Sequence, residues 1–309
     1  MRIAIIGAGM AGLTCATRLT ENGHEVTVFD KGRGPGGRMA TRRVEHEGET
    51  FRFDHGAQYF TAREMAFQTQ VRAWEADGIV APWPAAKEGA WVGTPGMNAP
   101  IRAMAEALNV QFATRVSALV RERGGWRLEG EGLADASFDA VVVAVPAEQV
   151  APLLAGHAPD LAEDARDVTR EPCWTAMVAF EGRVDAPDTL TDEGAIGWAA
   201  RNSAKPGRDT DRECWVIQAS PRWSRAQLER EAENVGEELL AHFARAVGDL
   251  PPVLFSTAHR WRYAKCEKND AGARWDAAQR IGVCGDWLSG PRVENAFLSG
   301  LELARLIEG

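Results

Sequence analysis

Lysine is scarce in this chain of 309 residues, in which only five lysines accompany 30 arginines. Acidic residues outnumber basic ones by 44 to 35, so the formal net charge is -9. Nucleic acids and anionic membranes both favour a positively charged protein surface. The composition therefore argues against either as a partner, and we expect the partners to be small molecules. The sequence leaves the oligomeric state open.

Long apolar runs are lacking as well. A membrane-spanning helix needs roughly 18 or more consecutive apolar residues, whereas the longest compact run, residues 140–145, ends at Pro146. The N-terminus opens directly on a strand pattern, without a basic segment followed by a cleavage site. From these two features we expect a cytoplasmic protein with no membrane partner.

Cysteine and histidine occur in no pattern that would bind a metal. The five cysteines form no C-x-x-C pair and the six histidines form no H-x-x-x-H pair, although such spacings are typical of metal sites. An odd number of cysteines in a chain of this size also argues against a disulfide framework. The G-x-S-x-G motif of serine hydrolases is absent too. We predict reduced thiols, no metal and no Ser-His-Asp catalytic set.

The first thirty residues, in contrast, have the pattern of a nucleotide-binding βαβ unit. Arg2–Ile6 and Glu25–Phe29 are short apolar runs typical of buried parallel strands, and residues 13–22 between them have helical spacing. The turn before the helix reads Gly7-Ala8-Gly9-Met10-Ala11-Gly12, which fits G-x-G-x-x-G in the strand-turn-helix context that this motif requires.

Each glycine of this motif has a separate role. Gly7 makes the tight turn, Gly9 lets the backbone approach a pyrophosphate, and Gly12 lets the helix pack on the strand. The N-terminus of the helix attracts phosphate charge. Asp30 ends the second strand, where an acid receives ribose hydroxyls and repels a 2′-phosphate. The alternative is a purely structural turn with an ordinary surface aspartate.

A second glycine loop favours FAD over NAD. Gly34-Pro35-Gly36-Gly37-Arg38 combines a backbone that a phosphate can approach with a guanidinium that can bind one. Lys31 stands beside Asp30, near the expected adenosine. A plain NAD domain has no need of this second loop, whereas a longer cofactor that continues across the domain does. We therefore expect noncovalently bound FAD.

The C-terminal residues supply the other end of this expected cofactor site. Gly285-Asp286 follows a predicted strand at Ile281–Cys284, and its acid can hold the ribityl hydroxyls. Asn295-Ala296 begins a predicted helix over residues 295–307, whose positive end can face the flavin. The alternative is an edge turn followed by a surface helix.

We predict an α/β fold, in which a Rossmann-type FAD-binding domain is built from discontinuous segments and carries an inserted substrate domain of mixed sheet plus helix. The inserted part alternates strand-like segments with loops and contains a long amphipathic helix, which we predict over residues 225–247. The expected ranges are 1–65, 92–160 and 255–309 for the FAD-binding domain, and 66–91 and 161–254 for the substrate domain.

Several segments resemble the renalase-like branch of the FAD-dependent amine oxidase superfamily, which includes bacterial-type renalases and NAD(P)/FAD-dependent oxidoreductases. The resemblance extends over nearly the whole chain. The segments read KGRGPGGRMATR (31–42), FDHGAQYFTAR (53–63), WAARNSAKPGR (198–208), WVIQASPRWSRAQLE (215–229), HRWRYA (259–264) and CGDWLSGPRVENAFLSG (284–300).

The resemblance implies an oxidase that converts the 2- and 6-dihydro isomers of the nicotinamide dinucleotide to NAD+. Dioxygen would accept the electrons and become hydrogen peroxide. The resemblance also implies contacts with FAD at Ala11, Asp30, Lys31, Arg38, Gln58, Tyr59, Val116, Asp286 and Ala296.

Catalytic side chains are less clearly marked, because the cofactor itself carries the chemistry of hydride transfer. Tyr59, His259 and Trp261 are candidates for positioning a substrate over the flavin, with simple core packing as the alternative. Trp174, Trp198 and Tyr263 are further candidates, which could form an aromatic wall for a planar ring.

Cations for the substrate phosphates are expected in one loop. Arg201, Asn202 and Lys205, followed by Arg208, lie close together in the sequence, and the alternative is a solvated loop. Amine oxidases of the wider superfamily often place a lysine near the flavin, for which Lys205, Lys265 and Lys268 are the candidates.

Three other functions remain open at this stage. One is a flavin amine oxidase or dehydrogenase that acts on small amines. Another is an NAD(P)H-dependent flavin reductase or hydroxylase, against which stands the presence of only one G-x-G-x-x-G motif. The last is a flavin sensor without enzymatic activity.

Overall fold

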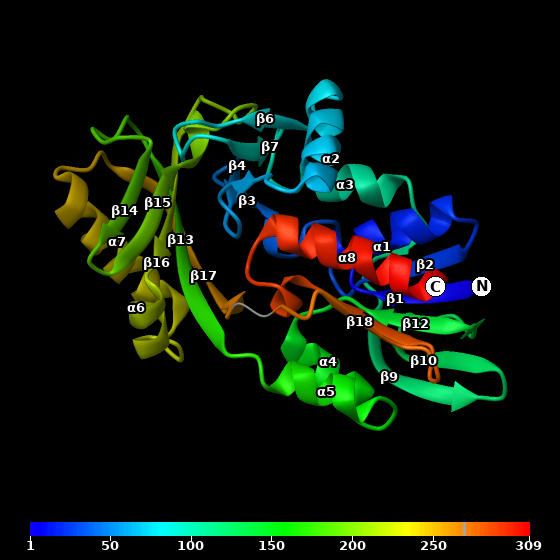
Figure 1. Cartoon of the computed structure of the whole chain (residues 1–309). Helices are drawn as coiled ribbons and strands as arrows, with labels where there is room; N and C mark the ends of the chain where they lie inside the picture. The colour runs from blue at the N-terminus through cyan, green and yellow to red at the C-terminus, as the bar shows by residue number, and fades with distance from the viewer. Residues whose placement is uncertain (268–269) are drawn as a thin grey trace.

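A six-stranded, mostly parallel sheet organises one lobe of the molecule (Figure 1). In the computed structural model, which describes residues 1–267 and 270–309, its order is β18-β19-β12-β1-β2-β8, and only the edge strand β18 runs antiparallel. The central strands are apolar along their length because both faces of the sheet are covered. The strands are β1 (Arg2–Ile6), β2 (Glu25–Phe29), β8 (Val110–Gln111), β12 (Ala140–Val143), β18 (Ala273–Asp276) and β19 (Ile281–Cys284).

Different elements cover the two faces of this sheet. Helices pack on one face and form a core with it, namely α1 (Met10–Glu21), α2 (Met65–Ala76), α3 (Ala99–Glu106) and α8 (Val293–Glu308). The other face carries two helices and a three-stranded sheet, namely α4 (Ala147–Leu154), α5 (Pro159–Arg166), β9 (Arg115–Glu122), β10 (Gly125–Glu131) and β11 (Ser137–Phe138).

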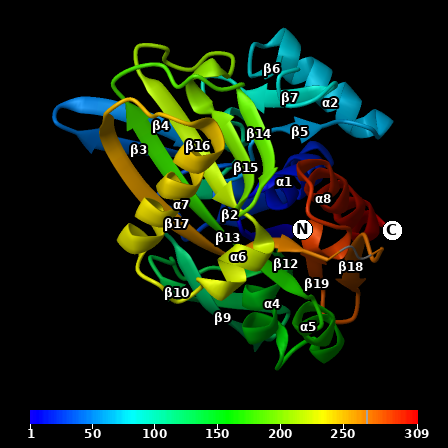
Figure 2. The same cartoon turned by 90° about the vertical axis from the view of Figure 1, so that its left-hand side faces the viewer.

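A five-stranded antiparallel sheet forms the second lobe, in the order β14-β15-β16-β13-β17. Its strands are β13 (Arg170–Phe180), β14 (Thr189–Glu193), β15 (Ile196–Arg201), β16 (Glu213–Ala219) and β17 (Val253–Cys266). Two helices lie over its outer face, α6 (Pro221–Ala226) and α7 (Ala232–Val247) (Figure 2). The inner face looks toward the first lobe.

Two small sheets fill the space between the lobes. The hairpin of β3 (Thr41–His46) and β4 (Glu49–Asp54) packs Phe51 and Phe53 against the inner face of the five-stranded sheet. The second small sheet consists of β5 (Phe60–Thr61), β6 (Val80–Pro82) and β7 (Ala90–Gly93). Short 3-10 turns occur at Gly37–Met39, Asn202–Ala204 and Asp286–Leu288.

The structure confirms the N-terminal βαβ unit and the C-terminal strand and helix, although α1 begins at Met10 rather than at residue 13. The single helix predicted over residues 225–247 is wrong, because α6 and α7 are separate. Between them, the carbonyl of Gln227 accepts a bond from the Trp174 indole, and that of Leu228 accepts one from Arg260. The carbonyl of Gln227 also accepts from the N–H of Arg230, which closes a turn and does not continue the helix.

The sheet memberships bear on the division into domains. The predicted boundary at residue 254 falls inside β17, which pairs with β13 along its length. We therefore propose that residues 253–266 belong to the substrate domain and that the FAD-binding domain resumes after them. The other predicted boundaries stay as proposals.

Helices α1 and α8 approach closely at a glycine. A Cβ atom added to Gly300 in α8 would lie 2.2 Å from the carbonyl oxygen of Ala11. Gly236 in α7 is also helical, but its Cβ would make an ordinary contact of 3.5 Å with Ala258. The two glycines therefore form a matched pair, in which the helical setting is shared and the available space differs.

We predict opposite effects on stability for Gly300→Ala and Gly236→Ala. Alanine favours a helix over glycine by up to about 1 kcal/mol, so Gly236→Ala should be neutral or stabilising. In Gly300→Ala the clash should outweigh this gain and lower the free energy of unfolding by about 1–3 kcal/mol. Chemical denaturation of both variants measures the difference. Equal stability of the two would show that α8 can move away from α1 at no cost.

Candidate active site

The N-terminus of α1 is open to a ligand. Its N-cap is Gly9, which offers no side-chain cap, and the first N–H groups of a helix have no partner within the helix. A Cβ at Gly9 would meet nothing within 4 Å, whereas one at Gly12 would lie 2.0 Å from the carbonyl oxygen of Gly7. Gly12 is therefore needed for packing, and Gly9 leaves the space that a pyrophosphate requires.

Asp30 lies beside this helix N-terminus. Its carboxylate accepts hydrogen bonds from the backbone N–H of Ala8 at 2.7 Å and of Gly32 at 2.6 Å. The backbone carbonyl of Asp30 accepts from the N–H of Thr114, which brings the start of the strand that carries Val116 to the same place. Lys31 extends to Gln149, bonding its side-chain oxygen at 2.8 Å.

Arg38 and Asp286 are 248 positions apart in the sequence and form a bidentate ion pair. Nη1 of Arg38 lies 2.7 Å from Oδ2 of Asp286, and Nη2 lies 2.5 Å from Oδ1. The arginine side chain is 36% exposed and the aspartate 7%. The structure thus joins the glycine loop of Gly37 to the turn of Gly285. The pair leaves part of the guanidinium accessible, and we propose that this part contacts a phosphate.

The start of α8 completes this group of residues. Asn295, in the first turn, donates hydrogen bonds from Nδ2 to the carbonyls of Ser289 and Gly290, which orders the turn before the helix. Like α1, α8 has no side-chain cap, so the N–H groups of its first turn are available up to Asn295, whereas the N–H of Ala296 donates to the carbonyl of Arg292. Among the residues that the structure describes, the buried indole Nε1 of Trp287 has no hydrogen-bond partner.

The predicted cofactor residues fit FAD. The structure gathers two uncapped helix ends, an acid at the end of a strand and a cation–carboxylate pair, which together match the phosphates and hydroxyls of a dinucleotide. Individual contacts, including that of Met10, remain proposals.

The loop of residues 55–58 lies between this group and the inner face of the second lobe. The N–H of Ala57 donates to the carbonyl of Arg38 at 2.9 Å. From the other side, Nε2 of Gln218 donates to the carbonyl of Gly56 at 2.7 Å, and Nε1 of Trp261 donates to that of His55 at 2.8 Å. Both lobes therefore fix the backbone of this loop.

One row of side chains crosses the inner face of the five-stranded sheet opposite the loop. Strand register pairs Trp198 with Gln218, Gln218 with Thr175, and Thr175 with His259. Because directly paired residues point to the same face, these four side chains form a continuous row, which we call the inner row. It is uncharged when His259 is neutral. Tyr59 lies against Trp198, with ring centroids 5.5 Å apart.

His55, His259 and Trp261 form a cluster at the end of the inner row. The ring centroids of His55 lie 5.0 Å from His259 and 4.9 Å from Trp261, and those of His259 and Trp261 lie 4.6 Å apart. Burial, followed by the effects of His259 and Arg42, lowers the pKa of His55 to about 4. Burial and the charge of Arg42 also lower the pKa of His259. Both imidazoles are therefore neutral at pH 7.

The expectation that the 201–208 loop presents free cations to substrate phosphates is wrong. Its cationic side chains are buried and form ion pairs with carboxylates inside the protein. Arg201 is 1% exposed and pairs with Asp188 and Glu213 over the ring of Trp215. Asn202 bonds the backbone of residues 52 and 54.

Lys205 and Arg208 share the carboxylate of Asp54, which is fully buried. Burial alone would raise the pKa of Asp54, but these two cations hold it well below its usual range. Burial lowers the pKa of Lys205 to about 8, although Asp54 opposes the shift. Nζ of Lys205 also lies 3.1 Å from the side-chain oxygen of Gln58. Of the two lysine candidates that the structure describes, Lys205 is the one beside a predicted cofactor residue.

Other candidates lie elsewhere. Trp174 is buried in the core beneath α7, on the outer face of the sheet, and Tyr263 is exposed. Lys265 is exposed on β17, and Lys268 lies outside the described residues.

Sequence reasoning missed His55, Thr175 and Gln218. His55 stands inside the FDHGAQYFTAR segment, three positions before the predicted Gln58, so its position gave a usable signal. Gln218 stands inside the WVIQASPRWSRAQLE segment, whereas Thr175 lies in none of the segments named above, and only strand register brings the two into the inner row.

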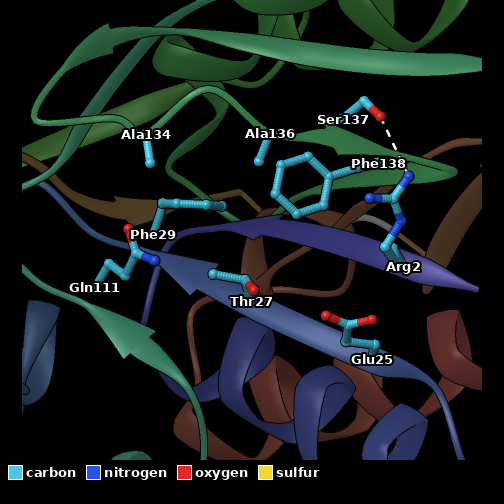
Figure 3. A pocket seen from close by; sticks show the side chains of 9 residues that line it. All are labelled: Arg2, Glu25, Thr27, Phe29, Gln111, Ala134, Ala136, Ser137 and Phe138. Atoms are coloured by element: carbon cyan, nitrogen blue, oxygen red, sulfur yellow. Dashed lines mark hydrogen bonds between the residues drawn. The ribbon is translucent and has the colours of Figure 1, made fainter.

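A separate pocket lies along β2, beneath the three-stranded sheet (Figure 3). Phe29 and Phe138 meet edge to face across it at 5.8 Å, and Arg2 bonds the hydroxyl of Ser137. It lies on the face of the central sheet opposite α1, and none of the predicted cofactor residues lines it.

Comparison with known proteins agrees with this arrangement. Residues 5–73 match the NAD(P)-binding Rossmann-like domain, and residues 85–307 match the flavin containing amine oxidoreductases. The chain belongs to the flavin containing amine oxidoreductases. This membership confirms the predicted fold class and an enzyme that is an FAD-dependent oxidoreductase.

Two solved structures share the fold over nearly the whole of both chains. A candidate protoporphyrinogen oxidase from Exiguobacterium is 13% identical, with a TM-score of 0.78 and coverage of 99% of this chain and 98% of the other. Cyclohexylamine oxidase from Brevibacterium oxydans is 12% identical, with a TM-score of 0.72 and the same coverage.

The curated relatives match only a short segment. A 4,4'-diapophytoene desaturase from Staphylococcus aureus is 49% identical over 51 residues, which are 16% of this chain and 10% of the relative.

Among the described residues, no helix is both long and apolar enough to cross a membrane.

We predict that Arg38→Ala weakens FAD binding by about ten-fold to a hundred-fold. The substitution removes a charge-assisted hydrogen-bond donor and leaves the buried Asp286 unpaired, which typically costs about 1.5–3 kcal/mol. Equilibrium titration of the apoprotein with FAD measures the affinity. Arg43→Ala is the control, because Arg43 pairs with Glu45 at the exposed surface. If both variants bind FAD as the wild type does, Arg38 has no part in holding the cofactor.

We also predict that His55 makes the protein less stable at acidic pH. Its pKa is about 4 in the fold against an ordinary 6.5, so the unfolded chain binds the proton first and stability falls as the pH drops through this window. Between about pH 7 and about pH 4.5 the loss from this group is about 2 kcal/mol. Urea denaturation at several pH values should show a shallower dependence for His55→Gln than for the wild type or for His242→Gln. Parallel profiles in all three proteins would rule out this role of His55.

Proposed function

We propose that this FAD-dependent oxidoreductase oxidises the 2- and 6-dihydro isomers of the nicotinamide dinucleotide to NAD+, as in the renalase-like branch. The substrate ring loses a hydride, bound FAD supplies the acceptor of these two electrons, and dioxygen with one proton leaves as hydrogen peroxide. The protein orients the flat ring and keeps water away from it. We further propose that the FAD is held noncovalently.

The inner row is the observation that supports this proposal. It places Trp198, Gln218 and His259 on three strands of one sheet, opposite the loop that adjoins the cofactor residues. A flat, neutral ring such as dihydronicotinamide suits a wall of aromatic and imidazole groups. Because neighbouring strands fix each position, such a ring would be held at a defined distance from the cofactor, which hydride transfer requires.

Charge also favours this substrate over an amine. Close to the loop of residues 55–58, the cations Arg42, Lys205 and Arg208 accompany the carboxylate of Asp54. A protonated amine would leave water for an environment with an excess of positive charge, which is unfavourable. A dinucleotide, whose diphosphate is anionic, would be favoured there.

Oxidation of a small amine is the second candidate. The family is described as flavin containing amine oxidoreductases, and cyclohexylamine oxidase shares the fold. The pair of Tyr59 and Trp198, tilted by 47° with centroids 5.5 Å apart, is the observation that favours it, because aromatic faces attract an ammonium group.

The test is reduction of the purified, oxidised flavoprotein under anaerobic conditions. We predict that the 2- or 6-dihydro isomers bleach the flavin absorbance rapidly, whereas NADH, whose hydride sits on a different ring carbon, and simple amines do so slowly. Admission of air should restore the absorbance and yield hydrogen peroxide.

Two results would contradict the proposal. Rapid bleaching by cyclohexylamine or another primary amine, with none by the dihydro isomers, would establish the amine oxidase. Rapid bleaching by NADPH alone would establish a reductase.

A further inference from the structure

Arg42 is a half-buried cation at the junction between the two lobes. It stands on β3, four positions after Arg38 in the cofactor loop. Among residues 1–267 and 270–309, no hydrogen bond or ion pair of its side chain is found, whereas Arg38, Arg201 and Arg208 each bind a carboxylate. An arginine with five donors and no partner, partly removed from solvent, is a suitable site for an anion.

The alternation of β3 places the side chain of Arg42 on the face that looks toward β17. Residues two apart on a strand share a face. Val44 packs in the cluster of Phe51 and Phe53 against the five-stranded sheet, and His46 lies 5.3 Å from Phe255 of β17. Arg42 continues this stripe toward the cofactor end.

The neighbouring strand carries a parallel stripe. Phe255 and His259 of β17 share a face, because they pair with Ala179 and Thr175 of β13 on the inner side of the sheet. Arg42 is accordingly close enough to His55 and His259 for its charge to disfavour their protonation. The cation thus lies at the end of the inner row, beside the His55–His259–Trp261 cluster.

The carboxylates of Asp54 and Asp286 do not neutralise Arg42, because both are paired with other cations. The nearest carboxylate on the paired strand is Asp54, which is fully buried and already accepts from Lys205 and Arg208. It also accepts from the hydroxyl of Thr41 and the N–H of Met97. Asp286 is paired with Arg38. These commitments leave the positive charge of Arg42 available.

We propose that Arg42 is a specificity-determining residue that binds an anionic phosphoryl group of the substrate beside His259 and Trp261. This inference rests on the proposed function and extends it, because it assigns recognition of the substrate phosphate to a residue outside the 201–208 loop. Arg42 also disfavours cationic amines, since a like charge at this position repels them. It holds the substrate and takes no part in the transfer of the hydride.

The test compares Arg42→Gln, which removes the charge, with Arg42→Lys, which retains it. Arg43→Gln is the matched control, because Arg43 is the next residue and lies on the opposite, exposed face of the same strand. Binding of ADP-ribose to the FAD-loaded proteins is followed by the change in flavin absorbance, which requires no turnover. Retention of FAD and the melting temperature confirm that each variant is folded.

We predict that Arg42→Gln raises the Kd for ADP-ribose by about ten-fold to a hundred-fold, the usual loss for a charge-assisted hydrogen bond. Arg42→Lys should recover part of the affinity, and Arg43→Gln should bind as the wild type does. With a dihydro isomer as the reductant, Arg42→Gln should raise its Kd and leave the limiting rate of flavin reduction unchanged.

An unchanged Kd in Arg42→Gln, or a wild type that does not bind ADP-ribose, would overturn this role of Arg42. The outcome is separate from that of the proposed function. If amines alone reduce the flavin but ADP-ribose binding still depends on Arg42, the anion site stands and the proposed substrate falls. If the dihydro isomers reduce all variants with equal Kd, the proposed substrate stands and the role of Arg42 falls.

Discussion

The backbone of residues 55–57 forms hydrogen bonds with both lobes, and the geometry of the candidate active site depends on these three bonds, which we call the clamp. Arg38 holds it from the cofactor side, and Gln218 and Trp261 hold it from the five-stranded sheet. A Cβ at Gly56 would lie 2.0 Å from the carbonyl oxygen of Arg38, so the approach is possible only because this residue has no side chain. The distance between the cofactor residues and the inner row is thereby set by one main-chain hydrogen bond on the cofactor side and by two bonds from side chains of the five-stranded sheet to main-chain carbonyls.

Charge is distributed unevenly around this clamp. In a protein with a formal net charge of -9, most arginines near the site are neutralised by carboxylates, and the buried Asp54 serves two cations at once. Removing one partner of such a buried group is costly, because the remaining charge is left without compensation. The network around Asp54 therefore supports the loop and the hairpin, whereas Arg42 stands outside it.

The sequence predicts the nucleotide half of the fold well because its signals are local. G-x-G-x-x-G, the acid Asp30 and the two flanking strands lie within thirty residues, and each has a direct physical reason. The pairing of Arg38 with Asp286 was not foreseeable in the same way, although both residues were predicted as cofactor contacts, since it joins positions 248 apart.

The second lobe was harder to predict for the same physical reason. Strand β17 does not show simple alternation of apolar and polar residues, and the inner row exists only through the register of four strands. For Arg201, Lys205 and Arg208 the prediction from the sequence was wrong. A cation-rich loop in the sequence suggested exposure, but buried carboxylates from distant segments neutralise it.

The inner row is built from the strands of a sheet, and this affects how the substrate specificity of the enzyme could change during evolution or in the laboratory. A wall made of loops changes shape through insertions and deletions. In this wall, the positions on β15, β16 and β13 are fixed by ladder bonds on both sides of their strands, and the position of His259 is fixed by the bonds of the edge strand β17 to β13. Replacement of Trp198, Gln218 or His259 would alter the shape and polarity of the wall one position at a time, while the neighbouring positions keep their places. New substrates are therefore most accessible through single substitutions along one row.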